Sequence, residues 1–418
     1  MLGRLARQRT QLGRAPLRRL CTADASRLVQ RGLSHVIGDT SEPLSSLTVD
    51  AMFRAAVDAN PSRDALLCPA QGLRLTYAEL EEEVTRATTG LHHLGLSKGD
   101  RLAAWLPNVP EYVVLQYASA RLGVILVTVN PAYRLPELRH ALNLVGAKAL
   151  ALIPSLSSSD YIEMARALID DASVPSLEHV LVRAGDVDIE LRAAAALGGM
   201  GASYKDVISA SRKRPSLSAP LPSTHQHEVI NIQFTSGTTG LPKAVALTHR
   251  SLVNNGKFCA RGQRLTSSDR VGVPVPMYHC FGIVIGSLAC VNVGATLCFP
   301  SPTFDAAATL RAVQDEQLTA LYGVRRDPST TMLMTTTTTT TITPTIVLRI
   351  YGMQVPTMFI AELALPDFSS YDLSSLRTGV MAGSICPVET MRQARSRHAT
   401  SACDLGARCS ARDHLACR

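Results

Sequence analysis

The sequence predicts an α/β fold in which parallel βαβ units build sheets with helices on their faces. Helix-period and strand-period segments alternate from Leu75 onward, which is the order that βαβ units require. The strand segments are apolar at almost every position, as is typical of strands covered on both faces. A chain of 418 residues is long enough for one large domain or two ordinary ones with ample core.

The first predicted helix follows Thr76. Thr76 and Glu79 have the spacing of a capping box, in which each side chain bonds the backbone amide of the other residue. The apolar residues that then recur at helical spacing are Leu80, Val84, Ala87, Leu91 and Leu94. Gly95 is placed to end this helix, and residues 101–106 are predicted to form a short strand.

The next elements repeat this alternation. Pro110 suits the first turn of a helix, which is predicted to run to about Gly123. Residues 124–129 form a continuous, mostly β-branched apolar run, which predicts a strand buried on both faces. A further helix over residues 136–145 and a further strand over residues 148–153 follow.

The segment 155–225 is weakly informative. Serine and proline clusters near both of its ends predict surface connections, and the alanine-rich run 191–197 predicts a helix. Residues 281–299 are the most apolar long stretch of the chain, but glycine, serine, asparagine and threonine interrupt it. A buried helix and strand are therefore expected there, and no transmembrane segment.

The N-terminal residues 1–23 are predicted to be a mitochondrial transit peptide, which implies a location in the mitochondrial matrix. They carry arginines and no acidic residue, with leucines spaced among them. A secretory signal would need an uninterrupted apolar stretch, which this segment lacks. A disordered basic tail is the alternative.

Two segments look foreign to the domain predicted over residues 45–393. Residues 324–354 contain a run of consecutive threonines at 335–341, and such low-complexity sequence does not specify a packed core. We hypothesise that this insert is a retained intron. Residues 394–418 are rich in Arg, Ala, Ser and Cys without periodicity, which predicts either an aberrant, frameshifted end or a disordered tail.

The net charge of +8 belongs to these unusual segments. Residues 1–23, 324–354 and 394–418 together carry more net positive charge than the whole chain, so the remainder is slightly acidic. A nucleic-acid footprint on the main body is therefore not expected.

The cysteines give no metal or disulfide signal. None of the 10 cysteines forms a C-x-x-C pair, which argues against a zinc framework or a disulfide scaffold. Reduced, mostly buried thiols are expected, and no residue is predicted to ligate a metal.

The segment TSGTTGLPK at residues 235–243 carries the chemistry. It follows an apolar, β-prone run at 229–234, so we expect it at the end of a strand. Its glycines let backbone amides approach a phosphate chain, its hydroxyls can bond phosphate oxygens, and its lysine adds a fixed positive charge. The spacing of Gly240 and Lys243 fits neither the P-loop pattern nor the Rossmann fingerprint. The predicted nucleotide-binding residues are Thr235, Ser236, Gly237, Thr238, Thr239, Gly240, Leu241, Pro242 and Lys243.

This segment resembles the phosphate-binding signature of the adenylate-forming (AMP-binding) superfamily, which includes acyl-CoA synthetases, firefly-type luciferases and peptide-synthetase adenylation domains. The family usually has glycine after the lysine, where this chain has Ala244. The other blocks that resemble the family, in the same order along the chain, are NPAYRLPEL at 130–138, PMYH at 276–279 and GVMAGS at 379–384. The resemblance covers about residues 45–323 and 355–393. It implies the large N-terminal region of the adenylate-forming fold, without the family's small C-terminal domain.

With the basic leader, the resemblance implies a mitochondrial fatty acid–CoA ligase, an AMP-forming acid–thiol ligase for medium-chain acids. The fatty acid carboxylate attacks the α-phosphorus of ATP, giving an acyl-adenylate, and coenzyme A then displaces AMP, with Mg²⁺ bridging phosphate oxygens. His279 is implied to orient the carboxylate, and Gly383 and Ser384 to line the adenine and acyl side. The alternatives are a satisfied core histidine for His279 and an ordinary strand and turn for residues 379–384.

Several blocks that the family places after this turn are not found. They are a Tyr-Gly-x-Thr-Glu block, a ribose-binding aspartate, a hinge arginine and a transition-state lysine. Tyr351 and Gly352 mimic the first block, but they stand before Gly379. This chain as printed is therefore expected to make little acyl-CoA. A non-catalytic ATP-binding remnant or isoform is the main alternative; a peptide-synthetase-type adenylation domain and a P-loop NTPase are disfavoured.

Overall fold

The computed structural model describes residues 41–213, 221–235, 242–324 and 357–382. The chain divides into two compact units, Met1–Ser45 and Ser46–Arg418. In the first unit the described residues 41–45 form no helix or strand, and the second unit holds every element named below. The predicted leader 1–23, residues 325–354 of the predicted insert and the predicted tail 394–418 lie outside the described residues.

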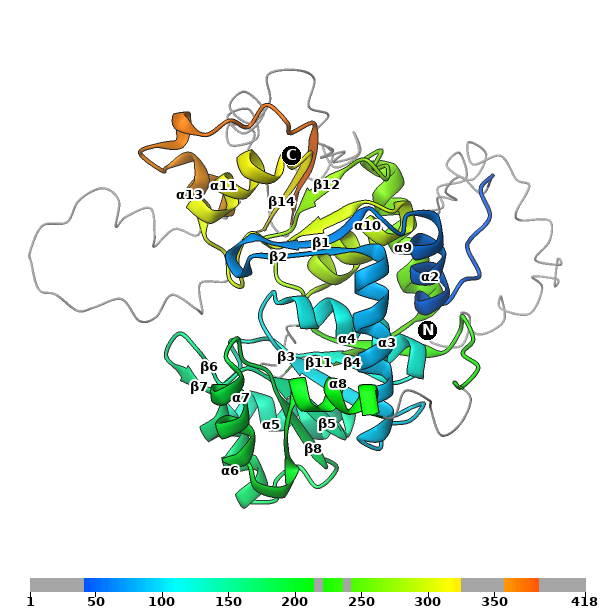
Figure 1. Cartoon of the computed structure of the whole chain (residues 1–418), viewed down its shortest axis with the longest axis vertical. Helices are drawn as coiled ribbons and strands as arrows, with labels where there is room; N and C mark the ends of the chain where they lie inside the picture. The colour runs from blue at the N-terminus through cyan, green and yellow to red at the C-terminus, as the bar shows by residue number, and fades with distance from the viewer. Residues whose placement is uncertain (1–40, 214–220, 236–241, 325–356, 383–418) are drawn as a thin grey trace, which may run out of the picture. The chain divides into compact units, whose positions relative to one another are not determined.

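Two sheets organise the second unit (Figure 1). The seven-stranded sheet has the order β11 (Lys243–Thr248), β10 (Val229–Thr235), β4 (Ile125–Thr128), β3 (Arg101–Trp105), β5 (Ala149–Leu152), β8 (His179–Val182) and β9 (Gly201–Ser203). The six-stranded sheet has the order β15 (Thr378–Ala382), β14 (Ala320–Val324), β12 (Arg270–Gly272), β13 (Thr296–Cys298), β1 (Asp64–Cys68) and β2 (Leu73–Thr76). Neighbouring strands are parallel except at β11 and β2, which close one edge of each sheet as antiparallel strands.

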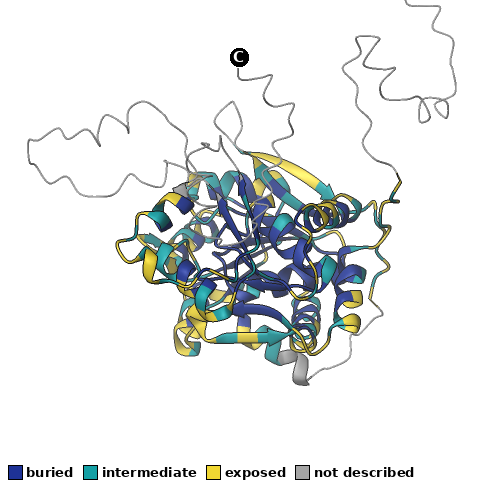
Figure 2. Cartoon of the chain, turned by 90° about the horizontal axis from the view of Figure 1, so that it is seen from above, coloured by how far each residue is buried: buried dark blue, intermediate teal, exposed yellow. Residues whose placement is uncertain are grey.

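A middle layer of helices separates the two sheets. Alternate residues of β3 show this: Leu102 and Ala104 face a core shared with the six-stranded sheet, whereas Ala103 and Trp105 face a second core. The middle layer comprises α2 (Val49–Ala59), α3 (Tyr77–His93), α4 (Pro110–Leu122), α8 (Tyr204–Lys213), α9 (His249–Gly262), the π-helix η4 (Phe281–Leu288) and α10 (Ala289–Val293). Figure 2 shows the buried residues concentrated in this interior.

Outer helices cover the remaining faces. Those on the seven-stranded sheet are α5 (Leu135–Val145), α6 (Tyr161–Asp170) and α7 (Val187–Ala195), and those on the six-stranded sheet are α11 (Ala306–Glu316) and α13 (Thr357–Leu363). Short elements complete the list: the hairpin β6 (Ser155–Leu156) and β7 (Ser159–Asp160), and the 3₁₀ turns η2 (Pro69–Gln71), η3 (Gly198–Met200) and η6 (Phe368–Ser370). The inner strands of both sheets are thus covered on both faces, which is why most of their residues are apolar and buried. The edge strand β11 is mostly exposed.

Helix α4 is buried on all sides. Every residue of α4 except Glu111 is buried, because helices and sheets surround it in the middle layer. Pro110 begins it, and Gly123 ends it with a φ of 72°, a left-handed conformation that glycine adopts without steric cost.

Most of the predicted elements before residue 153 are confirmed. Thr76 and Glu79 form the capping box of α3, and the strand predicted over 124–129 is β4. The prediction for residues 155–225 was incomplete: the helix expected over 191–197 overlaps only the second half of α7, which ends at Ala195, and this segment also forms α6, α8, β8 and β9. The apolar stretch 281–299 forms η4, α10 and β13. Within the described ranges, no helix is long and apolar enough to cross a bilayer.

Arg121 ties α4 to two neighbouring helices. Its guanidinium donates to Asp50 of α2 at 2.8 Å and to both carboxylate oxygens of Glu81 of α3 at 2.7 Å. The side chain is 7% exposed, so these bonds are largely shielded from water. Planar, bidentate pairing of this kind suits arginine better than lysine.

We expect Arg121→Met to lower the free energy of unfolding by about 3 kcal/mol, because it leaves the buried carboxylate of Asp50 with only its surface partner Arg54. Urea denaturation measures this. Arg86→Met is the matched control, since Arg86 pairs only with Glu82 and Glu83 on its own helix. Its loss is expected to cost less than about 1 kcal/mol. Equal losses for the two variants would contradict the assigned role of Arg121.

His249 should make stability fall in acid. It is fully buried at the start of α9, and its Nδ1 accepts the backbone N–H of Val49 at 3.0 Å. Desolvation lowers the pKa of His249 from the usual 6.5 to about 4; Lys98 acts in the same direction, and Glu228 and Asp50 oppose it. Between these pH values the unfolded chain binds a proton that the folded chain does not, so stability is lost as the pH falls.

We therefore expect the free energy of unfolding to drop by on the order of 2 kcal/mol between about pH 6.5 and pH 4 through His249 alone. His249→Gln should flatten this part of the profile, measured by urea denaturation at a series of pH values. The exposed His227 provides the control, because His227→Gln should leave the slope unchanged. A slope that survives in His249→Gln would show that other groups cause it.

Candidate functional site

The predicted phosphate loop is held between two paired strands. Strands β10 and β11 are antiparallel neighbours, and Thr235 at the end of β10 pairs with Lys243 at the start of β11. The predicted residues Ser236, Gly237, Thr238, Thr239, Gly240 and Leu241 lie outside the described residues. The pairing places Thr235 and Lys243, the two ends of this segment, side by side at the carboxyl end of β10.

A second block with a family resemblance lies beside the base of this loop. Strand β10 pairs in parallel with β4, and residues 130–138 follow the carboxyl end of β4. A ring nitrogen of His140 lies 3.3 Å from the carbonyl oxygen of Pro242, and the rings of Tyr133 and Phe234 meet edge to face. Sequence reasoning did not single out His140, because nothing local to α5 indicates that it contacts a residue 102 positions away.

Buried aromatic residues fix the start of this second block. The indole Nε1 of Trp105 donates to the carbonyl oxygen of Asn130 at 3.1 Å, and the hydroxyl of Tyr161 donates to that of Pro131. The rings of Trp105 and Tyr161 stack with centroids 3.7 Å apart. Large, fully buried rings of this kind restrict the backbone that they contact.

His279 lies on the segment that follows β12, not in the core. It is exposed, whereas a satisfied core histidine would be buried. Its Nδ1 accepts the backbone N–H of Phe281 at 3.2 Å, and the Sγ of Cys280 lies 3.5 Å from the same nitrogen. Desolvation by the surrounding protein lowers the pKa of His279 from its usual value, so the neutral ring is favoured at neutral pH. With Nδ1 as the acceptor, Nε2 carries the proton and can donate it to a ligand.

The turn at His279 requires the glycine at position 282. The N–H of Gly282 donates to the carbonyl of His279 at 3.0 Å, and a Cβ on Gly282 would lie only 2.4 Å from the carbonyl oxygen of Pro276. Any other residue would therefore push the His279 segment apart.

Asn108 connects the carboxyl edges of the two sheets. It follows β3 of one sheet, and its buried side chain bonds the segment that follows β12 of the other. Its Nδ2 donates to the carbonyls of Val273 and Val275 at 3.2 and 2.9 Å, and its Oδ1 accepts the N–H of Met277 at 2.9 Å. Sequence reasoning missed Asn108, since an asparagine before a helix ordinarily predicts only a cap or a turn.

Gly383 and Ser384, predicted to line the site, lie outside the described residues. Strand β15 ends immediately before them, and it runs parallel to β14, which in turn runs parallel to β12. The carboxyl ends of parallel strands open at one edge of a sheet. Residue 383 therefore follows the same edge from which the His279 segment leaves.

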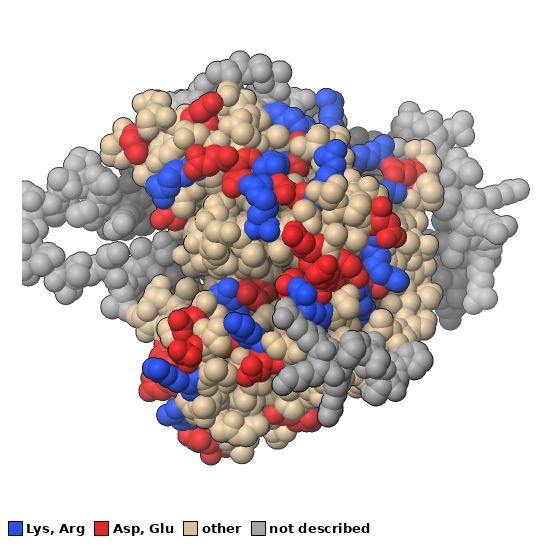
Figure 3. All heavy atoms as spheres, in the orientation of Figure 1, with Lys and Arg blue, Asp and Glu red and all other residues tan. Residues whose placement is uncertain are grey.

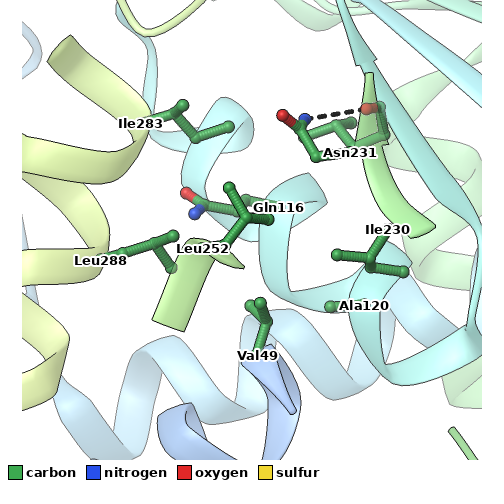
Figure 4. A pocket seen from close by; sticks show the side chains of 9 residues that line it. Val49, Gln116, Ala120, Ile230, Asn231, Leu252, Ile283 and Leu288 are labelled. Atoms are coloured by element: carbon green, nitrogen blue, oxygen red, sulfur yellow. Dashed lines mark hydrogen bonds between the residues drawn. The ribbon is translucent and has the colours of Figure 1, made fainter. Parts of the chain in front are cut away.

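One small cavity lies in the middle layer (Figure 4). Its lining is mostly apolar and comes from α2, α4, α9, η4, β4 and β10, with the amides of Gln116 and Asn231 as the polar groups. The side chain of Asn231 is held by its bond to the carbonyl of Leu126 at 2.8 Å. At about 10 Å³ the cavity has room for roughly one water molecule, so it is not a substrate pocket in this conformation.

Acidic and basic side chains are interspersed on the face shown in Figure 3. Ion pairs join several of them; Arg74 and Arg270, for example, both contact Asp64 and Glu316. Among the described residues, no group of three or more His, Cys, Asp and Glu side chains is placed to hold a metal ion.

Comparison with known proteins identifies relatives over most of the chain. The chain is 36% identical over 355 residues to the putative acyl-CoA synthetase YngI of Bacillus subtilis, covering 82% of this chain and 58% of that protein. It is also 36% identical over 392 residues to the human mitochondrial medium-chain acyl-CoA ligase ACSF2, covering 90% of this chain and 58% of that protein. This chain thus spans little more than half the length of these curated relatives.

The fold has matching solved structures. The crystal structure of the inhibitor-bound N-terminal domain of FACL13 from Mycobacterium tuberculosis superposes with a TM-score of 0.62 at 20% identity, covering 84% of this chain and 74% of that one. The α/β architecture of two mostly parallel sheets is therefore that of the N-terminal region of adenylate-forming enzymes, as the sequence predicted. The family model described as AMP-binding enzyme matches residues 53–405, and this chain belongs to that family.

Proposed function

We propose that this chain is an acyl-CoA synthetase that activates a medium-chain fatty acid with ATP through an acyl-adenylate. The observation that carries the proposal is the arrangement at the sheet edges. The hydroxyl- and glycine-rich loop closed by Thr235 and Lys243 follows β10, and Asn108 ties that sheet to the segment bearing His279. Membership of the AMP-binding family supports ATP as the nucleotide, and the relatives' names support the acyl-CoA product.

In this proposal residues 235–243 hold the phosphates of ATP. The strand pairing brings Thr235 and Lys243 together. The backbone amides and hydroxyls of the segment would bond phosphate oxygens, and Lys243 would add a positive charge. Residues 235–243 contain no carboxylate, so Mg²⁺ would come to this segment as a companion of the nucleotide, bound mainly through its phosphates. It would neutralise phosphate charge when bound.

His279 would orient the fatty acid carboxylate. Its neutral ring can donate a hydrogen bond from Nε2, since Nδ1 already accepts the N–H of Phe281. A neutral hydrogen-bond donor positions the carboxylate without neutralising the negative charge that makes it nucleophilic. Gly383 and Ser384 would line the adenine and acyl side, where small residues leave room.

Coenzyme A as the acyl acceptor and the mitochondrial matrix as the location are parts of the same proposal. Residues 1–23 would be the transit peptide, residues 45–393 the ligase N-terminal domain, residues 324–354 an insert and residues 394–418 an aberrant or disordered tail. The printed sequence after Ser384 contains no Tyr-Gly-x-Thr-Glu block. We therefore propose that this chain binds ATP but makes acyl-CoA slowly.

Lys243→Ala should weaken ATP binding by about 10- to 100-fold, the usual effect of losing one charged hydrogen bond. Isothermal titration calorimetry of the full chain with Mg²⁺–ATP measures this. Lys205→Ala is the matched control, because Lys205 is an exposed lysine on α8, away from the loop. Wild-type protein that binds no ATP, or Lys243→Ala protein that binds it normally, would refute the assignment of the loop.

His279→Ala should slow acyl-adenylate formation by about 10- to 100-fold and leave ATP affinity nearly unchanged, because it misplaces the acid and not the nucleotide. Exchange of labelled pyrophosphate into ATP, dependent on octanoate, reports this step. An exposed histidine away from the site, changed in His227→Ala, serves as the control. ATP binding without exchange for any carboxylic acid would instead support the non-catalytic alternative.

A further inference from the structure

We propose that Asn108 is a positioning residue that sets the geometry of the His279 segment. The catalytic part of this inference rests on the proposed function, in which His279 orients the fatty acid carboxylate. Its physical basis is independent of that function: one buried side chain makes three hydrogen bonds to the segment that ends in His279.

The bonding of Asn108 uses nearly its full capacity. An asparagine amide has two N–H donors and one carbonyl acceptor. Here the two donors meet the carbonyls of Val273 and Val275, and the acceptor meets the N–H of Met277. Alternate residues of the segment are therefore fixed in turn, over the stretch that leads directly to His279.

The backbone of Asn108 adds a contact to a third segment. Its N–H donates to the carbonyl of Pro302 at 2.9 Å, in the chain that follows β13. Asn108 is 4% exposed, so water cannot readily replace these bonds. The residue is thus held between β3 and α4, and its side-chain hydrogen bonds restrain the backbone of the His279 segment.

No other standard side chain reproduces this pattern at the same size. Leucine has the right volume but leaves two carbonyls and one N–H unsatisfied. Aspartate keeps the acceptor for Met277 but points a second oxygen at the carbonyls of Val273 and Val275, which repels them. Position 108 therefore needs a side chain with both donor and acceptor groups. The segment that this side chain bonds carries His279, the proposed acid-binding residue.

The test is made on the full chain with Asn108→Ala and Asn108→Asp. Cys280 is exposed beside His279, so its labelling by a maleimide, followed by peptide mass spectrometry, reports the geometry of this segment. The rate of Cys280 labelling should change by at least about fivefold in both variants, because the loss of buried hydrogen bonds makes local opening of the segment more frequent. The NMR titration of His279 should also move towards the ordinary histidine pKa.

Asn292→Ala is the matched control. Asn292 donates through Nδ2 to the carbonyls of Leu288 and Val253, so it too links segments through an amide, but both of these acceptors lie outside residues 273–279. Its variant should label at the wild-type rate. Wild-type labelling and titration in Asn108→Ala, or the same changes in Asn292→Ala, would overturn the inference.

Two further measurements separate the alternatives. If the Asn108 variants do not fold, hydrogen exchange of the Met277 amide in wild-type protein decides: strong protection supports the contact, and fast exchange overturns it. If His279→Ala leaves pyrophosphate exchange intact while Asn108→Ala still alters Cys280 labelling, the catalytic proposal for His279 fails and the positioning of its segment stands.

Discussion

The structure depends on one constraint: helix α4 lies between two sheets with almost no access to water. Polar groups in that layer must find partners inside the protein or cost free energy. Arg121 of α4 pairs with carboxylates on α2 and α3. The hydroxyl of Ser287 on η4 donates to Gln116 of α4 and is hydrogen-bonded to the hydroxyl of Tyr117, also on α4. The middle layer is thus held by specific polar contacts as well as apolar packing, which restricts how the two sheets can shift.

The same constraint explains where the functional segments lie. Among the described residues the middle layer is tightly packed, and the small cavity between α4, α9 and η4 has room for roughly one water molecule. In sheets of this kind, ligands bind in the crevice beyond the carboxyl ends of the strands. The segments after β3, β4, β10, β12 and β15 all leave from carboxyl ends of parallel strands, and Asn108 joins those of the two sheets.

Local signals made much of the fold predictable, and long-range contacts account for the rest. Thr76 capped α3 as predicted because its capping partner is three residues away. The hydroxyl-rich loop was recognisable because its residues are consecutive. By contrast, Asn108 contacts residues 165 to 169 positions away, and His140 contacts Pro242, so no sequence pattern could indicate them. Strand β8 was missed because its apolar run covers only residues 180–182, whereas β4 and β5 lie within longer apolar runs.

The charge near the candidate site indicates how the work of binding ATP would be divided. The loop of residues 235–243 supplies many neutral donors but a single lysine, whereas a triphosphate carries several negative charges. Neutral amides and hydroxyls fix phosphate oxygens in space without balancing their charge. Most of the neutralisation would then come from the metal that accompanies the nucleotide, and the protein would supply position. In such a site accurate placement would matter alongside charge, and the buried amide of Asn108, which bonds the segment leading to His279, would contribute to that placement.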